Sequence, residues 1–408
     1  MSYRFDTEAQ QRVQDYGAKI GDVLGDDGRR ASFALYFFGL LGEGERKSVE
    51  PMVARAVPDP DQLDAAHQRI LHFLNDSPWS DHEVRRFAAW YAIRAMEAKA
   101  PIDASIIDDT GMLKQGKHSV GVQRQYTGSA GKITNCQIAV SLSVANGQEQ
   151  LPLDFELYLP RTWTDDAARR KEARIPGDIR FRTKPQIALD LLRRAVADEI
   201  PLGVLLADCG YGNSFEFRKG VRELGLDYAM AVDATTNVFV LGDLRVPSSE
   251  KISVRDLALR LCYRKKTYRR VTWREGTAGF LSARFAFCRV VAAHDDGSDP
   301  ASRPVEWLVA EWPDGEVQPT KFYLVTLRSI GKKQIVRLIK ERWRTERVYQ
   351  DLKDELGFDH FEGRRWPGWH HHVSVVLAAF AFIVAEHARS FPPSARREAR
   401  HDEIALAA

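Results

Sequence analysis

The sequence has few cysteines, no long hydrophobic run and no apolar leader, and each absence excludes a class of protein. Its four cysteines in 408 residues form no Cys-x-x-Cys pair, which excludes a zinc ribbon, a thioredoxin-type site and a disulfide scaffold. The most apolar stretch, residues 373–385, has 13 residues and is too short to span a bilayer. The N-terminus lacks the apolar segment of a signal peptide. The sequence therefore predicts a soluble cytosolic protein with reduced thiols.

The net charge is also small, because 59 Lys and Arg residues nearly balance 56 Asp and Glu residues and leave a formal charge of +3. So small a charge excludes a polycation that coats nucleic acid without selectivity, although local basic patches remain possible. With 44% hydrophobic and 28% charged residues, the chain can bury substantial cores beneath a soluble surface. Its length predicts two or three domains.

The hydrophobic periodicity changes along the chain. Residues 1 to about 95 predict helices, including amphipathic stretches that begin near Asp59 and Ser80. Strands are then predicted over 104–109, 118–126, 133–144, 202–207 and 228–232, with helices over 185–197 and 215–224. This β-β-β-α-β-α-β order, completed by a last helix, predicts a ribonuclease H-like α/β fold. Such a fold has a mixed five-stranded sheet flanked by helices.

The same pattern divides the chain into segments. About 90 residues with β-like periodicity separate the last of these strands from the final long helix, which predicts an inserted β-rich subdomain. We expect an N-terminal helical domain at 1–98, the first part of the core at 99–235, the β-rich insertion at 236–328, the last core helices at 329–392 and a tail at 393–408.

Two aspartates lie where predicted core strands end, Asp108 at the end of the first and Asp208 at the end of the fourth. The carboxyl ends of neighbouring parallel strands meet at one sheet edge, so both carboxylates would emerge there. Two close carboxylates repel each other unless a cation intervenes, and a hard divalent ion such as Mg2+ suits their oxygens. The alternative is that each aspartate caps a turn, which for Asp108 alone is an equally good explanation.

Asp109 competes with Asp108 for this role. Successive side chains of a strand point to opposite faces of the sheet, so one member of the pair can face the site. We prefer Asp108 and keep Asp109 as the alternative.

A third acid lies in the helix predicted to begin near residue 332, to run towards residue 356 and to stop at Gly357. At about 100° per residue, Arg342 falls about 40° and Lys353 about 20° from Glu346, so the three would share one face. That face should cover the sheet edge. Taken alone, the spacing also fits an ordinary intrahelical ion pair worth about 0.2–0.5 kcal/mol.

Basic residues are dense around this helix and in a second cluster at residues 264–274, where tyrosines and a tryptophan are interleaved. Basic and aromatic side chains together suit contact with a phosphate backbone and stacking on bases. The predicted DNA-contacting residues are Lys340, Arg342, Arg344, Lys353, Lys265, Lys266, Arg269 and Arg270. For the second cluster, solvated strand faces with core aromatics explain the pattern equally well.

The chain resembles the DDE-class transposases of bacterial insertion sequences. The matching motifs are IIDDTG at 106–111, LLADCGYG at 205–212 and RWRTERVYQDLK at 342–353. The last reproduces the Arg-x3-Glu-x6-Lys part of a Tyr-x2-Arg-x3-Glu-x6-Lys signature found in the group with a β-strand insertion before the glutamate. The signature's tyrosine would fall at Ile339. Residues 39–52, GLLGEGERKSVEPM, are also typical of one branch of these transposases.

The resemblance implies that Asp108, Asp208 and Glu346 hold two Mg2+ or Mn2+ ions, and that Arg342 and Lys353 contact phosphates near the scissile bond. The family's first aspartate is commonly followed by x-Thr or x-Ser, as Asp108 is by Thr110. No residue of the protein would act as a nucleophile. The implied substrates are double-stranded transposon ends and target DNA, the N-terminal helices would recognise the terminal repeats, and a homodimer or higher assembly is expected on DNA.

Two other functions remain open from the sequence. A catalytically silent or domesticated copy would bind DNA without cutting it, and the missing tyrosine leaves room for this alternative. A hydrolase with two carboxylates, such as a glycosidase, would need neither a metal ion nor the basic residues at 342 and 353.

Overall fold

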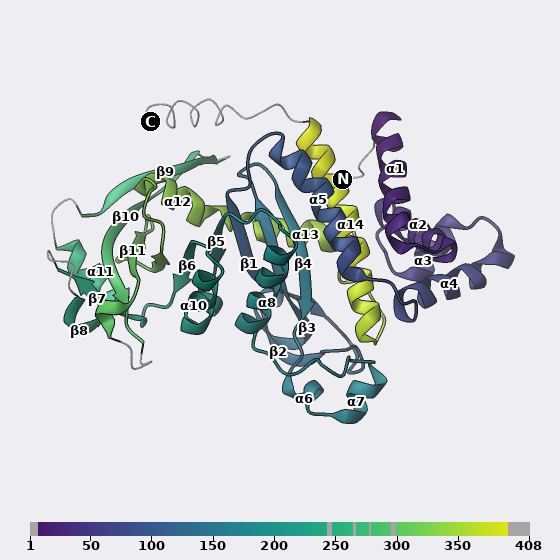
Figure 1. The fold of residues 1–408 in the computed structure, drawn as a ribbon, viewed down its shortest axis with the longest axis horizontal. Coiled ribbons are helices and arrows are strands. Elements are labelled where there is room, and N and C mark those ends of the chain that lie inside the picture. The colour runs from purple at the N-terminus through teal and green to yellow at the C-terminus, as the bar shows by residue number, and fades with distance from the viewer. Residues whose placement is uncertain (1–6, 243–246, 264–266, 277–278, 295–298, 391–408) are drawn as a thin grey trace. The chain divides into compact units, whose positions relative to one another are not determined.

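The computed structural model describes residues 7–242, 247–263, 267–276, 279–294 and 299–390, which form two compact units. Unit 1 comprises the described residues of Met1–Asp103, Asp108–Pro201 and Arg344–Ala408. Unit 2 comprises those of Ala104–Ile107 and Leu202–Trp343. Strand β1, Ala104–Leu113, therefore gives its first four residues to unit 2 and the rest to unit 1. Figure 1 labels most of the helices and strands.

Unit 1 begins with helices, as the sequence predicts, and continues into antiparallel strands. Ser80 caps α5 as predicted, because its side chain accepts a hydrogen bond from the Glu83 N–H. The elements of unit 1 besides β1 are α1 (Thr7–Leu24), α2 (Asp27–Leu41), α3 (Val49–Ala56), α4 (Leu63–Asn75), α5 (Asp81–Glu97), β2 (Gln123–Thr127), β3 (Lys132–Ala145), β4 (Gln150–Leu157), α6 (Arg161–Thr164), α7 (Ala167–Glu172), α8 (Lys184–Ala197), α13 (Arg344–Asp354) and α14 (Trp366–Ser390).

Strand β3 organises the sheet of unit 1. It lies beside β1, and backbone hydrogen bonds from Asp103 to Ala145 and from Lys114 to Asn135 show that the two strands are antiparallel. The N-terminal part of β3 pairs with β2 and the C-terminal part pairs with β4, and both pairings are antiparallel. The strand predicted at 118–126 is correct in its last four residues, because residues 118–122 form a turn. The third core strand is β4, which the sequence analysis did not identify.

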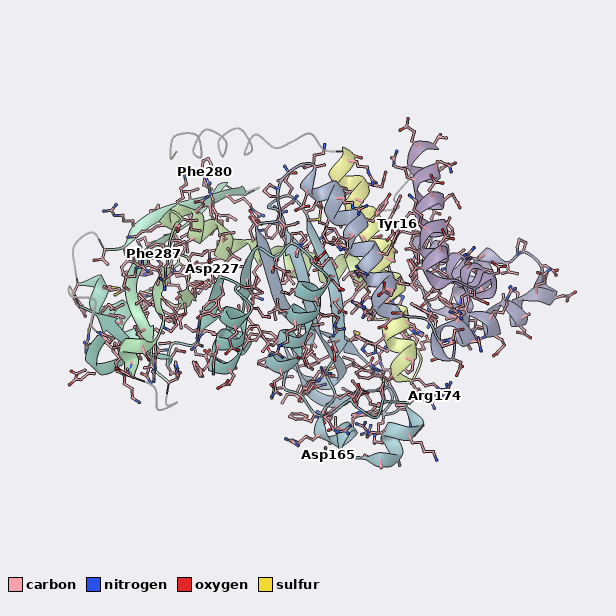
Figure 2. All side chains as sticks on the ribbon, in the orientation of Figure 1. Tyr16, Asp165, Arg174, Asp227, Phe280 and Phe287 are labelled. Atoms are coloured by element: carbon pink, nitrogen blue, oxygen red, sulfur yellow. The ribbon has the colours of Figure 1, made fainter. Side chains whose placement is uncertain are left out.

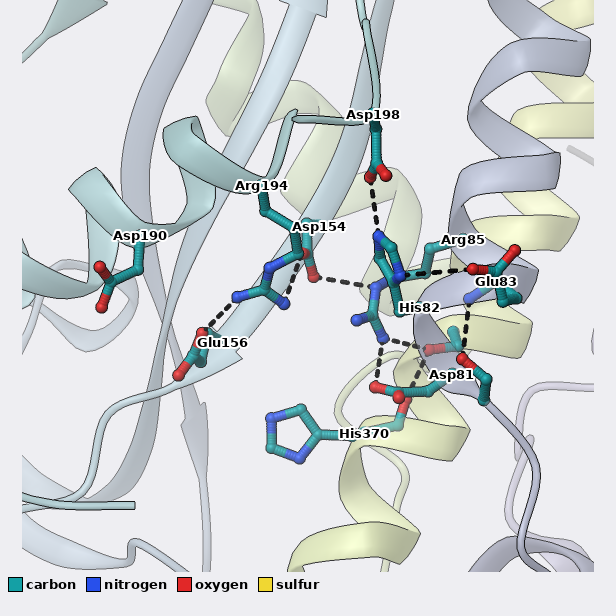
Figure 3. Close-up of polar contacts among 12 residues, drawn as sticks. Asp81, His82, Glu83, Arg85, Asp154, Glu156, Asp190, Arg194, Asp198 and His370 are labelled. Carbon is teal, nitrogen blue, oxygen red and sulfur yellow. Dashed lines mark hydrogen bonds and ion pairs between the residues drawn. The ribbon is translucent and has the colours of Figure 1, made fainter. Parts of the chain in front are cut away.

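Strand β4 is buried at every position although it carries two acids, Asp154 and Glu156. Arginines on α5 and α8 neutralise them (Figure 3): Arg85 Nε lies 3.0 Å and Arg194 Nη1 3.1 Å from the Asp154 carboxylate. Arg194 Nη2 also lies 2.8 Å from Glu156, which pairs with Arg182 as well. Buried charges need such partners, so this network holds β4 against two helices.

Helix α14 forms the centre of the helical layer in unit 1 and is buried over nearly its whole length. The Tyr16 hydroxyl donates to the Ala378 carbonyl at 2.9 Å, and Tyr36 bonds to the buried His372 at 2.7 Å. Figure 2 labels Tyr16 among the side chains of unit 1. Among the described residues, α14 is the one helix long and apolar enough to cross a membrane, and 83% of its apolar window is buried. Its packing is that of a core helix.

In unit 2 the first four residues of β1 begin a sheet with the order β1-β5-β6-β12-β11-β10-β7-β8, and β9 pairs with β10. Strands β1, β5 and β6 are parallel, and β12 pairs antiparallel with β6. The elements are β5 (Val204–Ala207), α9 (Cys209–Gly212), α10 (Phe215–Glu223), β6 (Tyr228–Val232), β7 (Asn237–Leu241), β8 (Pro247–Ser253), α11 (Val254–Cys262), β9 (Arg269–Gly276), β10 (Gly279–Ala292), β11 (Val305–Trp312), β12 (Lys321–Val325) and α12 (Lys332–Glu341).

The strand order confirms the predicted α/β class with a mixed, ribonuclease H-like sheet flanked by helices. The β-rich segment after β6 continues the sheet of unit 2 beyond β6 through β12. The two units also divide the chain differently from the predicted segments. Helices α1–α5 belong with α14 in unit 1, where α1, α2, α4 and α5 contact α14 and α3 packs against α2 and α4, and residue 235 falls inside unit 2.

Candidate active site

Asp108 and Asp109 lie in the middle of β1, which continues to Leu113, and not at its end as the sequence predicted. Asp108 is nevertheless the first residue beyond the part of β1 that pairs with β5. Lys184, at the start of α8, places its Nζ 3.0 Å from each carboxylate oxygen of Asp109. Asp109 thus has a cation partner within unit 1. The Asp108 Oδ1 accepts a hydrogen bond from the Asp109 N–H at 2.8 Å.

Asp208 directly follows β5 in unit 2 and caps the short helix α9. Its Oδ1 accepts a hydrogen bond from the Gly210 N–H at 2.9 Å, and its Oδ2 has no hydrogen-bond partner among the described residues. In the parallel register of β1 and β5, Ile107 pairs with Ala207. Each of these paired residues is followed in the chain by an aspartate, Asp108 in one case and Asp208 in the other.

Glu346 lies in the first turn of α13 in unit 1, with an exposed side chain. It makes no hydrogen bond or ion pair with any described residue. One turn later, the Tyr349 hydroxyl lies 2.5 Å from the Ser141 hydroxyl of β3, which donates to the Asp108 carbonyl at 3.4 Å. Through Tyr349 and Ser141, the helix that carries Glu346 is therefore hydrogen-bonded to β3 and to the backbone of Asp108 on β1.

Lys353 fastens the other end of α13 to β1. Its ammonium donates to the Thr110 hydroxyl at 2.9 Å, the Gly111 carbonyl at 2.8 Å and the Ser129 hydroxyl at 3.3 Å. An ammonium has three N–H donors, so these bonds use all of them. Burial lowers the pKa of Lys353, while Asp359 and Asp354 partly oppose that shift.

The single long helix predicted from residue 332 to 356 is wrong, because the structure has two helices, α12 and α13, separated at Arg342 and Trp343. Arg342 ends α12 in unit 2 and therefore does not share a helix face with Glu346. Contacts with distant residues interrupt the helix at Arg342 and Trp343, although the local sequence favours a continuous helix. The Arg274 guanidinium lies 3.8 Å from the centre of the Trp343 ring in unit 2, whereas Arg344 donates to the Gly147 and Gln148 carbonyls in unit 1.

The glycines of both aspartate motifs allow close approaches that another residue would block. A Cβ at Gly111 would lie 1.9 Å from the Thr127 Oγ1 in unit 1. A Cβ at Gly212 would lie 2.0 Å from the Ala231 carbonyl in unit 2. Both glycines are therefore packing requirements beside the aspartates.

Comparison with known proteins identifies the family. The model of the DDE superfamily endonucleases matches residues 21–279, more than half of the chain. The chain belongs to the DDE superfamily endonucleases. A second family model, the transposase DDE domain, matches residues 182–382. The first range includes both aspartate motifs, and the second includes Asp208 and the glutamate motif.

A relative of this DDE endonuclease is a probable transposase for insertion sequence element IS701 from Microchaete diplosiphon. It is 30% identical over 211 residues, which are 52% of this chain and 50% of the relative. The chain thus spans about half the length of the curated relative that it matches. The two family models confirm the DDE family that the sequence motifs suggested.

The DDE endonuclease uses several of the predicted DNA-contacting cations internally. The Lys340 Nζ lies 2.6 Å from the Oε1 of the buried Glu311. Burial lowers the pKa of Lys340, and the charge of Glu311 opposes this shift. Arg344 bonds to the carbonyls named above, and Arg270 pairs with Asp314 at 2.7 Å. Arg269 is exposed, whereas Lys265 and Lys266 lie outside the described residues. Contact of these cations with DNA remains a prediction.

The structure also identifies a residue that sequence reasoning missed, Glu149 in the turn between β3 and β4. Burial raises the pKa of Glu149 to about 7, and Arg344 opposes this shift. Its sequence context, Asn-Gly-Gln-Glu-Gln, is that of an ordinary polar turn, so no sequence signal marks it.

The donor set fits divalent cations in its chemistry. Carboxylate oxygens are the ligands that Mg2+ prefers, and the Glu346 carboxylate is exposed and without a partner in the described part of the chain. Within those residues, no group of three or more His, Cys, Asp or Glu side chains is arranged to hold a metal ion. Asp108 and Glu346 belong to unit 1 and Asp208 to unit 2.

Proposed function

We propose that this DDE endonuclease is the transposase of an insertion sequence. It would bind the terminal inverted repeats of its element, cleave the DNA at these ends and join the 3′-hydroxyl ends to target DNA. The observation that carries the proposal is the register of β1 and β5, because Ile107 pairs with Ala207 and each precedes an aspartate. The pairing of these two parallel strands stops at Ile107 and Ala207, and sites of α/β folds typically lie beyond the carboxyl ends of parallel strands.

In this proposal Asp108, Asp208 and Glu346 are the catalytic residues, and they share two Mg2+ or Mn2+ ions. Once bound, the ions would activate the attacking hydroxyl and stabilise the leaving 3′-oxygen. The protein itself would position the reacting groups and neutralise the charge that develops on them. Tyr349 and Ser141 support this role, since they connect the helix of Glu346 to the backbone of Asp108.

The proposed partners are double-stranded transposon ends and target DNA, held by a homodimer or higher oligomer in the cytoplasm at the nucleoid. Helices α1–α5 would recognise the terminal repeats. The contacts proposed for DNA phosphates come from Arg342 and the other cations predicted from the sequence, except Lys353, whose N–H donors all bond within unit 1. The proposed function is therefore that of a metal-dependent polynucleotidyl transferase.

The test uses a labelled DNA fragment that carries the flanks of the gene, incubated with the full chain in Mg2+, Mn2+ or EDTA. We expect nicks at discrete flanking positions that require the metal and disappear with Glu346→Gln. The matched control is Asp354→Asn, which removes another exposed carboxylate from the same helix and should cleave like the unmodified chain.

Two outcomes would contradict the proposal. Specific binding with no cut in either metal would favour the silent or domesticated copy. Cleavage that persists in EDTA, or in the Glu346→Gln variant, would remove the metal and this glutamate from the mechanism.

A further inference from the structure

A cavity of about 420 Å³ lies within unit 1, between the loops that precede α3, follow β1 and follow α13. This volume is within the range of about 300–1,000 Å³ that is typical of small-molecule sites. It corresponds to a cube with a side of roughly 7.5 Å, whereas the major groove of a duplex alone is about 12 Å wide. The cavity can therefore hold a single nucleotide but not a double helix.

The cavity contains a partly buried ammonium that can donate one more hydrogen bond. Lys114 lines it and donates to the Asp359 carbonyl at 3.1 Å and to the Phe361 carbonyl at 2.8 Å. Its third N–H has no partner among the described residues, and none of their carboxylates lies within 4.0 Å of Nζ. Burial lowers the pKa of Lys114, and the charges of Asp359 and Glu362 oppose this shift. A bound anion would offset the cost of burying this charge.

Two arginines surround the opening. Arg364 is exposed and makes no hydrogen bond or ion pair with any described residue. Arg46 lies 3.5 Å from Glu362, with both side chains more than 70% exposed, so this pair is weak. The lining thus has three cations, Arg46, Lys114 and Arg364, against two carboxylates, Asp359 and Glu362.

The same cavity has an apolar wall. Leu113, the last residue of β1, lines it and is 55% exposed. Cationic groups beside an exposed apolar side chain match a nucleotide, which joins a phosphate to an apolar ring face. Leu113 lies five residues beyond Asp108 on β1, about 17 Å along the strand. The cavity is thus separate from the proposed catalytic carboxylates.

We propose that this cavity binds one nucleotide of a single DNA strand, with the phosphate on Lys114 and Arg364 and the sugar or base against Leu113. The inference rests on the proposed function, because it adds a second DNA contact to unit 1. Charge-assisted hydrogen bonds from ammonium and guanidinium groups to phosphate oxygens would provide the binding energy.

The experiment measures binding of the full chain to a labelled 12-nucleotide single strand, and to the same sequence as a duplex, by fluorescence anisotropy in EDTA. We expect Arg364→Gln and Lys114→Gln each to weaken single-strand binding about tenfold, as for the loss of one charged hydrogen bond. Duplex binding should change less than about twofold. The matched control is Lys117→Gln, an exposed lysine of the same loop that does not line the cavity and should change neither affinity by more than about twofold.

Competition distinguishes the possible sources of the phosphate. Deoxyadenosine monophosphate should displace the single strand from the unmodified chain but not from Arg364→Gln. Displacement by inorganic phosphate at the same concentration would show recognition of phosphate alone and overturn the nucleotide assignment. Single-strand affinity that is unchanged in both cavity variants, or equally reduced in Lys117→Gln, would also overturn it.

Lys114→Gln could disturb the loop, since Lys114 bonds to two carbonyls, so the exposed Arg364 provides the decisive variant. The assay needs neither metal nor cleavage. If the unmodified chain binds neither single strand nor duplex, the proposed function fails. If it binds both and the cavity variants behave like the unmodified chain, the cavity inference alone fails.

Discussion

The Lys184 ammonium lies 3.0 Å from both carboxylate oxygens of Asp109. Because a cation of the protein already neutralises Asp109, we expect this residue to be dispensable for cleavage. Asp108→Asn should abolish metal-dependent nicking, whereas Asp109→Asn should retain most activity and lose about 1 kcal/mol of stability or less. The measurement compares cleavage rates and thermal unfolding of the two variants. Lys184→Gln is the control and should resemble Asp109→Asn. An inactive but folded Asp109→Asn beside an active Asp108→Asn would reverse the assignment.

Lys353 should act mainly by fastening α13 to β1, because Thr110, Gly111 and Ser129 accept all three of its N–H donors. We expect Lys353→Gln to lower the free energy of unfolding by about 1–3 kcal/mol, since it leaves partly buried acceptors unpaired. The salt dependence of DNA binding should stay unchanged. Urea unfolding and affinity at several salt concentrations measure the two quantities. A slope reduced by about 0.9 would instead support the phosphate contact that the motif implies.

The paired charges around β4 should be essential for folding. Asp154→Asn removes the carboxylate shared by Arg85, whose side chain is 4% exposed, and Arg194. We expect a loss of about 1–3 kcal/mol in the free energy of unfolding, because the buried Arg85 guanidinium loses one of its two carboxylate partners and keeps Asp81 at 2.6 Å. Urea denaturation measures it. Asp190→Asn, at the more exposed rim of the same network, is the control and should cost less than about 1 kcal/mol. Equal losses of unfolding free energy in Asp154→Asn and Asp190→Asn would show that burial does not determine how much each ion pair contributes to stability.

Glu149 should make stability depend on pH near neutrality. Burial raises the pKa of Glu149 from its ordinary value of 4.5 to about 7 in the folded chain. Between these two pH values Glu149 is therefore protonated in the folded chain and ionised in the unfolded chain. The folded state then binds more protons, and stability falls as pH rises from about 4.5 to 7. We expect Glu149→Gln to flatten this decrease and to stabilise the protein at pH 8 by roughly 1–3 kcal/mol. Urea unfolding at pH 5 and pH 8 measures both effects.

The control for Glu149 is Glu97→Gln, at the exposed end of α5, which should leave the pH dependence unchanged. A Glu149→Gln variant with the same decrease in stability between pH 5 and pH 8 as the unmodified chain would assign that decrease to another group.

Elements with a simple burial pattern could be predicted from the sequence. Strand β6 begins and ends at the predicted residues, because a short apolar run marks it. Helix α8 begins one residue earlier than predicted, and a regular amphipathic stretch marks it. Strand β4 could not be recognised in this way. Its acids look like solvent-facing positions, and their arginine partners lie about 30 to 70 residues away in the sequence.

The candidate site shows the same limit. The acids at 108, 208 and 346 stand out by their motifs, and their spacing is local information. The end of α12 at Arg342 does not stand out, because residues 332–356 contain no proline or glycine to stop a helix. Contacts of Trp343 and Arg344 with distant residues decide that break. Likewise, the pairing of Asp109 with Lys184 depends on a contact across 75 positions.

Helix α14 comes near the end of the chain, yet Tyr16 and Tyr36 from the first two helices bond to it. During synthesis the early helices can reach α14 only after residues 366–390 have been made, so their apolar faces stay exposed until then. A frameshift or stop codon upstream of residue 366 removes that partner. Such a gene would be silenced by misfolding and degradation of its product, even with the codons for all three acids preserved.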